Sequence, residues 1–166
     1  MSKPKRPKYC WDTTVFLAWI QAEKGAPLDD IELVADEIDG DNADLIVPVT
    51  IYTEVLEAKH TKKQIKQFQL FLKRSNVLSV DTTIGIAQKA SDIRSKALKE
   101  GRKLKTPDAT VIATAIIYGA DVLHSLDPHM LGLNGSAASE GLRISLPRLI
   151  TGQKALPGIV SSEEDG

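Results

Sequence analysis

The chain has 166 residues, of which 42% are hydrophobic and 26% are charged. This length is typical of a single domain and is sufficient to bury a hydrophobic core. The formal net charge of -1 provides no overall attraction to nucleic acid, so a polyanion would have to be bound by local basic patches. One cysteine excludes an internal disulfide, and with only three histidines it gives little support to a zinc site. These features favour a reducing compartment and predict a cytoplasmic protein.

The two ends of the chain differ in composition from the middle. Residues 1–7 form a basic N-terminal extension, and only a short apolar run follows them, so neither a signal peptide nor a membrane span is predicted. Residues 8–149 are predicted to form one domain. Residues 150–166 have little apolar surface to bury and are predicted to be a flexible tail.

Short strands and helices alternate along the chain. The first half is expected to contain strands at residues 8–11 and 44–49, helices at 13–23 and 28–38, and a helix capped by Thr50. In the second half, strands are expected at 77–80, 120–126 and 142–146, helices at 62–74, 83–100 and 106–117, and a loop at 132–141. The helix at 106–117 is small or apolar nearly all round, which predicts that it is buried. The pattern predicts an α/β fold with a parallel central sheet sandwiched by helices in three layers.

Four acidic residues occupy positions that a purely structural design would not require. Asp12 follows the first strand, Glu54 shares a helix face with apolar residues, Asp108 begins the most apolar helix, and Asp127 follows the fourth strand. In open parallel sheets, functional sites form beyond the carboxyl ends of the strands, which is where these acids are expected to lie.

Each acid also has a structural interpretation. Asp12 would cap a helix, Asp108 would complement a helix dipole, and Asp127 would belong to an ordinary turn. Glu54 is harder to explain in this way, because burying an unpaired carboxylate on an apolar face is costly. Together, clustered carboxylates destabilise a fold unless a cation neutralises them. Oxygen ligands without histidine or cysteine favour Mg²⁺ or Mn²⁺, so the pattern predicts a site for one or two such ions.

Four segments that contain these acids resemble the ordered acidic motifs of PIN-domain proteins, whose best-known members are VapC-type toxins of toxin–antitoxin pairs. The segments are Cys10–Phe16, Pro48–Val55, Thr106–Ala115 and Val122–Asp127. The resemblance extends over nearly the whole domain, and the third motif is the most specific. It implies metal-dependent cleavage of RNA, with Asp12, Glu54 and Asp108 as core metal ligands. Asp127 would be a further ligand or a nearby acid.

The resemblance also implies supporting residues and partners. Ser125 stands where family members often carry Ser or Thr, and Thr13 directly follows the first acid, so both are expected to support the site. A homodimer is implied and, if the chain is a toxin, so is a small antitoxin protein that covers the acidic cleft. The substrate RNA would be hydrolysed by water, without a covalent nucleophile.

Basic residues near the acids are candidates for RNA binding. Arg102, Lys103 and Lys105 directly precede the third motif, and Lys59 lies beyond the second. The alternative for each is a solvated helix or loop surface. Phosphate contacts of this kind would give affinity and salt dependence but little sequence specificity.

Other functions are also compatible with parts of the pattern. A catalytically silent PIN-like module that binds RNA or protein would keep the fold without turnover. A phosphoaspartyl phosphatase would carry a second aspartate two residues after the first, but Thr14 stands there. A dinucleotide-binding domain is disfavoured because no glycine-rich turn follows the first strand.

Overall fold

The computed structural model describes residues 5–150, which contain a five-stranded sheet in the order β3-β2-β1-β4-β5. The strands are β1 (Lys8–Trp11), β2 (Asp44–Pro48), β3 (Val77–Val80), β4 (Val122–His124) and β5 (Arg143–Ser145). All neighbouring strands are parallel. This arrangement confirms the predicted α/β fold with a parallel central sheet.

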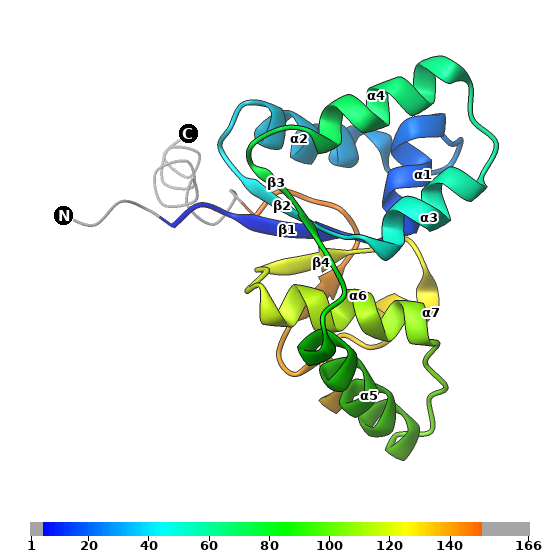
Figure 1. The fold of residues 1–166 in the computed structure, drawn as a ribbon, viewed down its shortest axis with the longest axis vertical. Coiled ribbons are helices and arrows are strands. Elements are labelled where there is room, and N and C mark those ends of the chain that lie inside the picture. Colours follow the sequence, from blue (N-terminus) through cyan, green and yellow to red (C-terminus); the bar gives the residue numbers. More distant parts are fainter. Residues whose placement is uncertain (1–4, 151–166) are drawn as a thin grey trace, which may run out of the picture.

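Helices cover both faces of the sheet (Figure 1). On one face lie α1 (Thr13–Gln21), α2 (Leu28–Asp39), α3 (Thr50–Glu57) and α4 (Lys62–Leu72). On the other lie α5 (Ile84–Lys99), α6 (Thr106–Ile117) and the short α7 (Pro128–Leu131). The chain changes face after β3, so that β2 and β4 extend from opposite sides of β1. The carboxyl ends of β1 and β4 therefore meet where the strand order reverses, the usual location of a site in such sheets.

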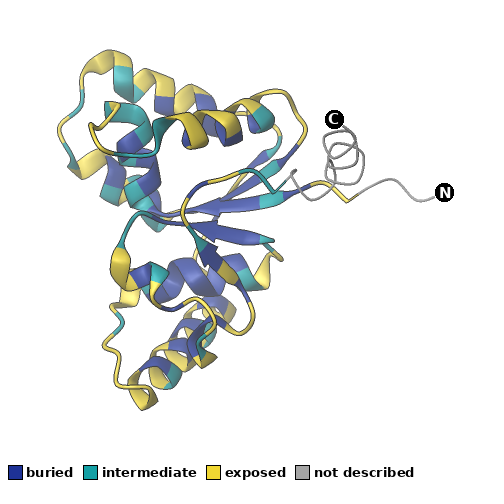
Figure 2. Cartoon of the chain, turned by 180° about the vertical axis from the view of Figure 1, so that it is seen from behind, coloured by how far each residue is buried: buried dark blue, intermediate teal, exposed yellow. Residues whose placement is uncertain are grey.

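The hydrophobic core lies between the sheet and its two helical layers, as the buried strands and inward helix faces of Figure 2 show. Residues 109–115 of α6 are all buried, which confirms that this helix packs inside the protein. Trp11 is completely buried and contacts the rings of Phe16, Trp19 and Phe71. Cys10 is also buried, as expected of a small core residue.

Several elements differ from the sequence predictions. The helices predicted at 13–23 and 62–74 and the strand predicted at 44–49 each end one or two residues earlier, and the short helix α7 was not predicted. Val49 occupies the position before α3, and Thr50 lies inside the helix, where its hydroxyl finds no partner among the described residues, so the predicted Thr50 cap is wrong.

The fourth strand spans only Val122–His124, which is shorter than predicted. Its predicted first residue, Ala120, belongs instead to the turn that ends α6, because its backbone N–H donates to the carbonyl of Ala115. The segment 132–141 is not a simple loop: Ala137–Ser139 forms a 3₁₀ turn with Ala138 and Ser139 buried.

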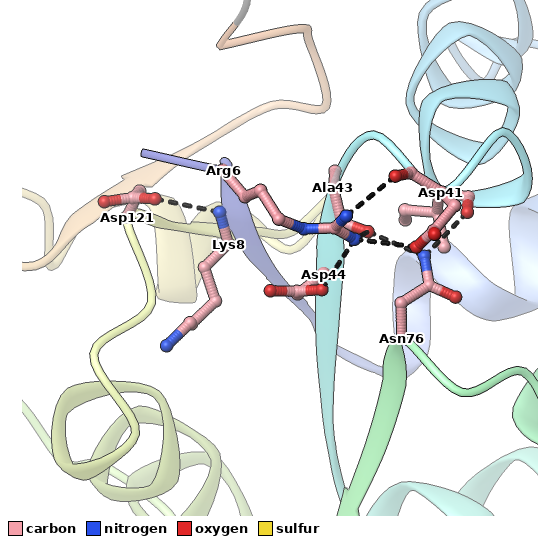
Figure 3. Close-up of polar contacts among 8 residues, drawn as sticks. Arg6, Lys8, Asp41, Ala43, Asp44, Asn76 and Asp121 are labelled. Carbon is pink, nitrogen blue, oxygen red and sulfur yellow. Dashed lines mark hydrogen bonds and ion pairs between the residues drawn. The ribbon is translucent and has the colours of Figure 1, made fainter. Parts of the chain in front are cut away.

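Hydrogen bonds and ion pairs connect the segments at the amino ends of β1, β2 and β4 (Figure 3). The Arg6 guanidinium donates to the backbone carbonyl of Asp41 at 2.8 Å and to the carboxylates of Asp41 and Asp44. The Lys8 backbone N–H donates to the Asp121 carboxylate at 2.8 Å. These bonds lie at the amino ends of the strands, whereas the four acids lie toward the carboxyl ends.

Part of the predicted domain division lies outside the structure. Residues 1–4 and 151–166 are not among the described residues, and they include most of the predicted N-terminal extension and C-terminal tail. Between residues 5 and 150, no helix has the length and apolar character needed to cross a membrane.

Candidate active site

The four predicted acids come from separate segments that reach the same edge of the sheet. Asp12 immediately follows β1, Glu54 lies in α3 after β2, Asp108 lies in the first turn of α6, and Asp127 precedes α7 after β4. The charge of Asp108 raises the pKa of Glu54 and the charge of Asp127 raises that of Asp108, so these three acids are close enough to affect one another's ionisation. Asp12 is linked to the segment of Asp127 through Ser125. The fold therefore brings together residues that are up to 115 positions apart in the chain.

Asp12 is the most deeply buried of the four, with only 7% of its surface exposed. Its Oδ1 accepts hydrogen bonds from the backbone N–H of Thr14 at 3.0 Å and of Val15 at 3.4 Å, which caps α1. Its Oδ2 accepts from the Ser125 hydroxyl. Burial raises the pKa of Asp12 from 3.8 to about 6, although these hydrogen bonds oppose the shift. The structural interpretation of Asp12 as a helix cap is correct. It does not explain why the fold keeps this carboxylate buried, which raises its pKa.

Thr14 is a site residue that was not expected from the sequence. Its hydroxyl donates to Asp12 Oδ1 and accepts the Leu126 backbone N–H at 2.8 Å. Ser125, a predicted supporting residue, makes a similar pair of contacts: its hydroxyl donates to Asp12 Oδ2 and accepts the Asp127 backbone N–H at 3.0 Å. Two hydroxyl groups thus join Asp12 to the loop that carries Asp127. A hydroxyl two residues after a strand-ending acid was the only sequence signal for this role.

Glu54 lies beside Asp12's neighbour Thr13. The Thr13 hydroxyl donates to Glu54 Oε1 at 3.1 Å. Burial raises the pKa of Glu54, and the nearby charge of Asp108 adds to this effect, while the hydrogen bond from Thr13 opposes it. Glu54 is therefore a half-buried carboxylate that accepts a hydrogen bond from a neutral donor.

Asp108 and Asp127 line one depression of about 500 Å³. Burial and then the charge of Asp127 raise the pKa of Asp108, whereas Lys105 and His129 oppose the shift. Asp127 also accepts the His129 backbone N–H at 2.9 Å and thereby caps α7. The predicted basic residues Arg102, Lys103 and Lys105 line the same depression. Lys59 is exposed and does not line it, so the structure separates Lys59 from the other three.

The donor chemistry of this edge fits a hard divalent cation. All four acids offer oxygen ligands, and the pKa values of Asp12, Glu54 and Asp108 are raised, which shows that the fold disfavours their negative charges. A bound cation would relieve that cost. Among residues 5–150, no three acidic, histidine or cysteine side chains are already clustered as a ready-made metal site. The four acids thus lie at the same edge of the sheet, but within residues 5–150 no three of them are close enough together to form a preformed metal site.

Comparison with known proteins identifies the family. The model of the PIN domain matches residues 9–133, so the chain belongs to the PIN-domain family. This result confirms the resemblance seen in the four acidic motifs. A search of curated proteins found no match.

Solved structures share the fold at low sequence identity. VapBC2 from Rickettsia felis, bound to a DNA fragment from its promoter, aligns with a TM-score of 0.60 and 16% identity over 82% of this chain and 96% of its own. VapC20 of Mycobacterium tuberculosis, described as a toxin that cleaves the sarcin–ricin loop, aligns with a TM-score of 0.57 and 14% identity over 81% and 98%. A toxin–antitoxin complex from Klebsiella pneumoniae aligns with a TM-score of 0.56 and 17% identity over 86% of this chain and 99% of its own. At these identities the likeness establishes the fold alone.

Proposed function

We propose that this PIN-domain chain is a metal-dependent endoribonuclease and the toxin of a toxin–antitoxin pair. The observation that carries the proposal is the convergence of Asp12, Glu54, Asp108 and Asp127 from four segments onto one sheet edge, with the pKa values of three of them raised. Functional sites are enriched in such perturbed carboxylates. Membership of the PIN-domain family supports a nuclease.

In this proposal Asp12, Glu54 and Asp108 hold one or two Mg²⁺ or Mn²⁺ ions, and Asp127 supports them as a further ligand or a neighbouring acid. The bound metal supplies Lewis-acid activation of water and neutralises charge on the phosphodiester. Ser125 and Thr14 hold the Asp12 carboxylate in place, and Thr13 orients Glu54. Lys105, close enough to Asp108 to affect its ionisation, attracts the phosphate backbone to an edge that would otherwise repel it.

RNA is the proposed substrate, and a small antitoxin protein and a second copy of the chain are the proposed partners. A structural neighbour described as a sarcin–ricin-loop-cleaving toxin supports the RNA substrate. Neighbours described as VapBC2 and as a toxin–antitoxin complex support the antitoxin. The homodimer and the cytoplasmic location rest on the family resemblance and the sequence composition.

Incubation of the purified chain with a panel of labelled structured RNAs, including a sarcin–ricin-loop hairpin, tests this function directly. Cleavage is expected in Mg²⁺ or Mn²⁺ and should stop when EDTA is added. Glu54→Gln should lose most of the rate, whereas Glu23→Gln, a matched change at an exposed position, should not. Binding without cleavage of any RNA would instead favour the catalytically silent module. Cleavage that persists in EDTA would contradict the metal-dependent mechanism.

A further inference from the structure

Two depressions share a single wall beside the acidic residues. The wall is the segment Arg102–Lys105, which joins α5 to α6 and is called the basic ridge below. On one side of the ridge is the depression that contains Asp108 and Asp127. On the other side is a groove of about 620 Å³, called the α5 groove, which the ridge forms together with Ser91, Arg94, Ser95 and Leu98.

The basic side chains of the α5 groove, which are Arg94 and those of the ridge, form no ion pairs within residues 5–150, although Lys105 lies near enough to Asp108 to oppose the rise in its pKa. The other side of the same helix is different, because Lys89 and Lys96 both pair with Glu140, at 2.8 and 3.0 Å. α5 therefore carries one neutralised basic side and one that is available to an anion.

One arginine of the groove, Arg94, is held by a hydrogen bond to the backbone. Arg94 Nε donates to the carbonyl of Leu104 at 2.9 Å, which links α5 to the ridge. Among residues 5–150, the terminal nitrogens of this guanidinium make no other hydrogen bond or ion pair, so they can contact an anion. The guanidinium of Arg102 lies beside Gly132 at the end of α7, where a Cβ atom added to the glycine would be 3.0 Å from Arg102 Nη1, so Arg102 reaches from the ridge toward the acidic depression. Ordered guanidinium groups lose less entropy on binding a phosphate than freely rotating lysines.

The remaining groove residues suit a nucleotide. Leu98 is 63% exposed and, with Leu104, offers an apolar surface for a sugar or base, while Ser91 and Ser95 offer hydroxyl groups for hydrogen bonds. Cations beside apolar and hydroxyl groups can bind the phosphates and the sugars or bases of a nucleic-acid strand. An acidic peptide would also meet the cations. The shared wall favours RNA over an acidic peptide as the occupant of the groove. An RNA strand whose phosphodiester lay in the acidic depression would extend over the ridge into the groove.

We propose that the α5 groove binds the RNA strand adjoining the scissile phosphodiester, with the basic ridge as the point where the strand passes from the groove to the acids. This assignment rests on the proposed ribonuclease function and assigns it a second binding site, away from the carboxylates. Arg94, Arg102 and Lys103 contact phosphates, and Leu98 packs against the nucleotide between them.

The first test measures RNA binding without cleavage. Fluorescence anisotropy of a labelled single-stranded RNA is recorded in EDTA over a series of salt concentrations for the full chain. Arg102→Gln combined with Lys103→Gln should weaken binding and reduce the slope of log K against log salt by about 1.4, because each lost phosphate contact on a single strand accounts for about 0.7. Lys73→Gln combined with Lys99→Gln removes the same charge from exposed positions outside the groove and should leave the slope unchanged.

A second variant tests the groove without altering the ridge. Ser95→Glu places a negative charge on α5 inside the groove and should raise the dissociation constant several-fold. Ser75→Glu makes the same change at an exposed position beyond the opposite edge of the sheet and should have no such effect. Unfolding temperatures of both variants establish that they are folded. Equal binding by native chain, ridge variant and Ser95→Glu would overturn the assignment.

Cleavage assays separate this inference from the proposed function. If the chain cleaves RNA and the groove variants raise KM with little change in kcat, both proposals hold. If it cleaves RNA and the groove variants leave KM unchanged, the groove assignment fails and the ribonuclease stands. If groove variants weaken RNA binding but no RNA is cut, the groove is an RNA site and the ribonuclease fails. Tight binding of poly-glutamate in place of RNA would overturn the groove's assignment to nucleic acid.

Discussion

Asp12→Asn is expected to lower the rate of metal-dependent RNA cleavage by roughly a thousandfold, the size of effect seen when one preorganised electrostatic group is removed from a transition state. Asn keeps the size of the side chain and can still accept the hydrogen bonds from the Thr14 and Val15 backbone that cap α1. The loss would therefore come from the missing charge rather than from a damaged helix. Single-turnover cleavage in Mn²⁺ measures it.

The same substitution is expected to stabilise the metal-free protein at neutral pH. The pKa of Asp12 rises from 3.8 to about 6 on folding because burial disfavours its charge. Between these two values the folded state binds more protons than the unfolded state, so stability falls as pH rises. The cost is absent below pH 3.8, complete above pH 6, and on the order of 3 kcal/mol. Asp12→Asn should remove this pH-dependent cost.

Urea unfolding in EDTA from pH 4 to 8 measures the difference between the two proteins. The difference in unfolding free energy should grow in favour of Asp12→Asn between pH 4 and 6 and then level off. Asp36→Asn, at an exposed position in α2, provides the control and should show no such trend. If the native chain and Asp12→Asn kept a constant difference over this range, Asp12 would not be the desolvated carboxylate described above.

Trp11→Ala is expected to destabilise the fold by about 3–5 kcal/mol, the usual cost of removing a large buried aromatic side chain. Trp11 is completely buried in β1 and packs against Phe16 and Trp19, with ring centroids 5.2 and 5.9 Å away. Because domains of this size are stable by only about 5–15 kcal/mol, much of the protein should unfold on mild heating. Urea unfolding followed by the fluorescence of Trp19 measures the effect.

Trp11→Phe is the matched variant, since it keeps a ring in the cluster and removes an indole N–H that has no hydrogen-bond partner among the described residues. It should cost clearly less than Trp11→Ala. If Trp11→Ala left the unfolding midpoint unchanged and instead weakened RNA binding, Trp11 would be a base-stacking residue rather than part of the core.

Local sequence patterns were sufficient to predict the strands and helices that carry the four acids. Strands in a parallel sheet end at a common edge, so acids that follow strands could be placed together without coordinates. Asp12 and Asp127 follow neighbouring strands β1 and β4, and Asp108 begins the helix that leads into β4. The buried helix at 106–117 was likewise evident from its composition, because no polar face was available for solvent.

Features that depend on contacts between distant segments could not be predicted. Thr14 acts through Leu126, 112 residues away, and no local pattern encodes that hydrogen bond. The 3₁₀ turn at Ala137–Ser139 is fixed by packing on α5 and by the bonds from Lys89 and Lys96 to Glu140, although its composition is that of a loop. Arg94 lines the α5 groove together with the ridge, and its side chain donates to the carbonyl of Leu104 there; no local sequence pattern indicated this contact.

The central claim, that the acids form a divalent metal site, is tested most directly by thermal unfolding of the native chain and of Asp108→Asn over a range of Mn²⁺ concentrations. A ligand that binds only the folded state stabilises it by about 2.7 kcal/mol at a hundredfold excess over its dissociation constant. The unfolding temperature of the native chain is expected to rise clearly with Mn²⁺, and that of Asp108→Asn little or not at all. An unfolding temperature that does not respond to Mn²⁺ in the native chain, or an equal rise in both proteins, would contradict the claim.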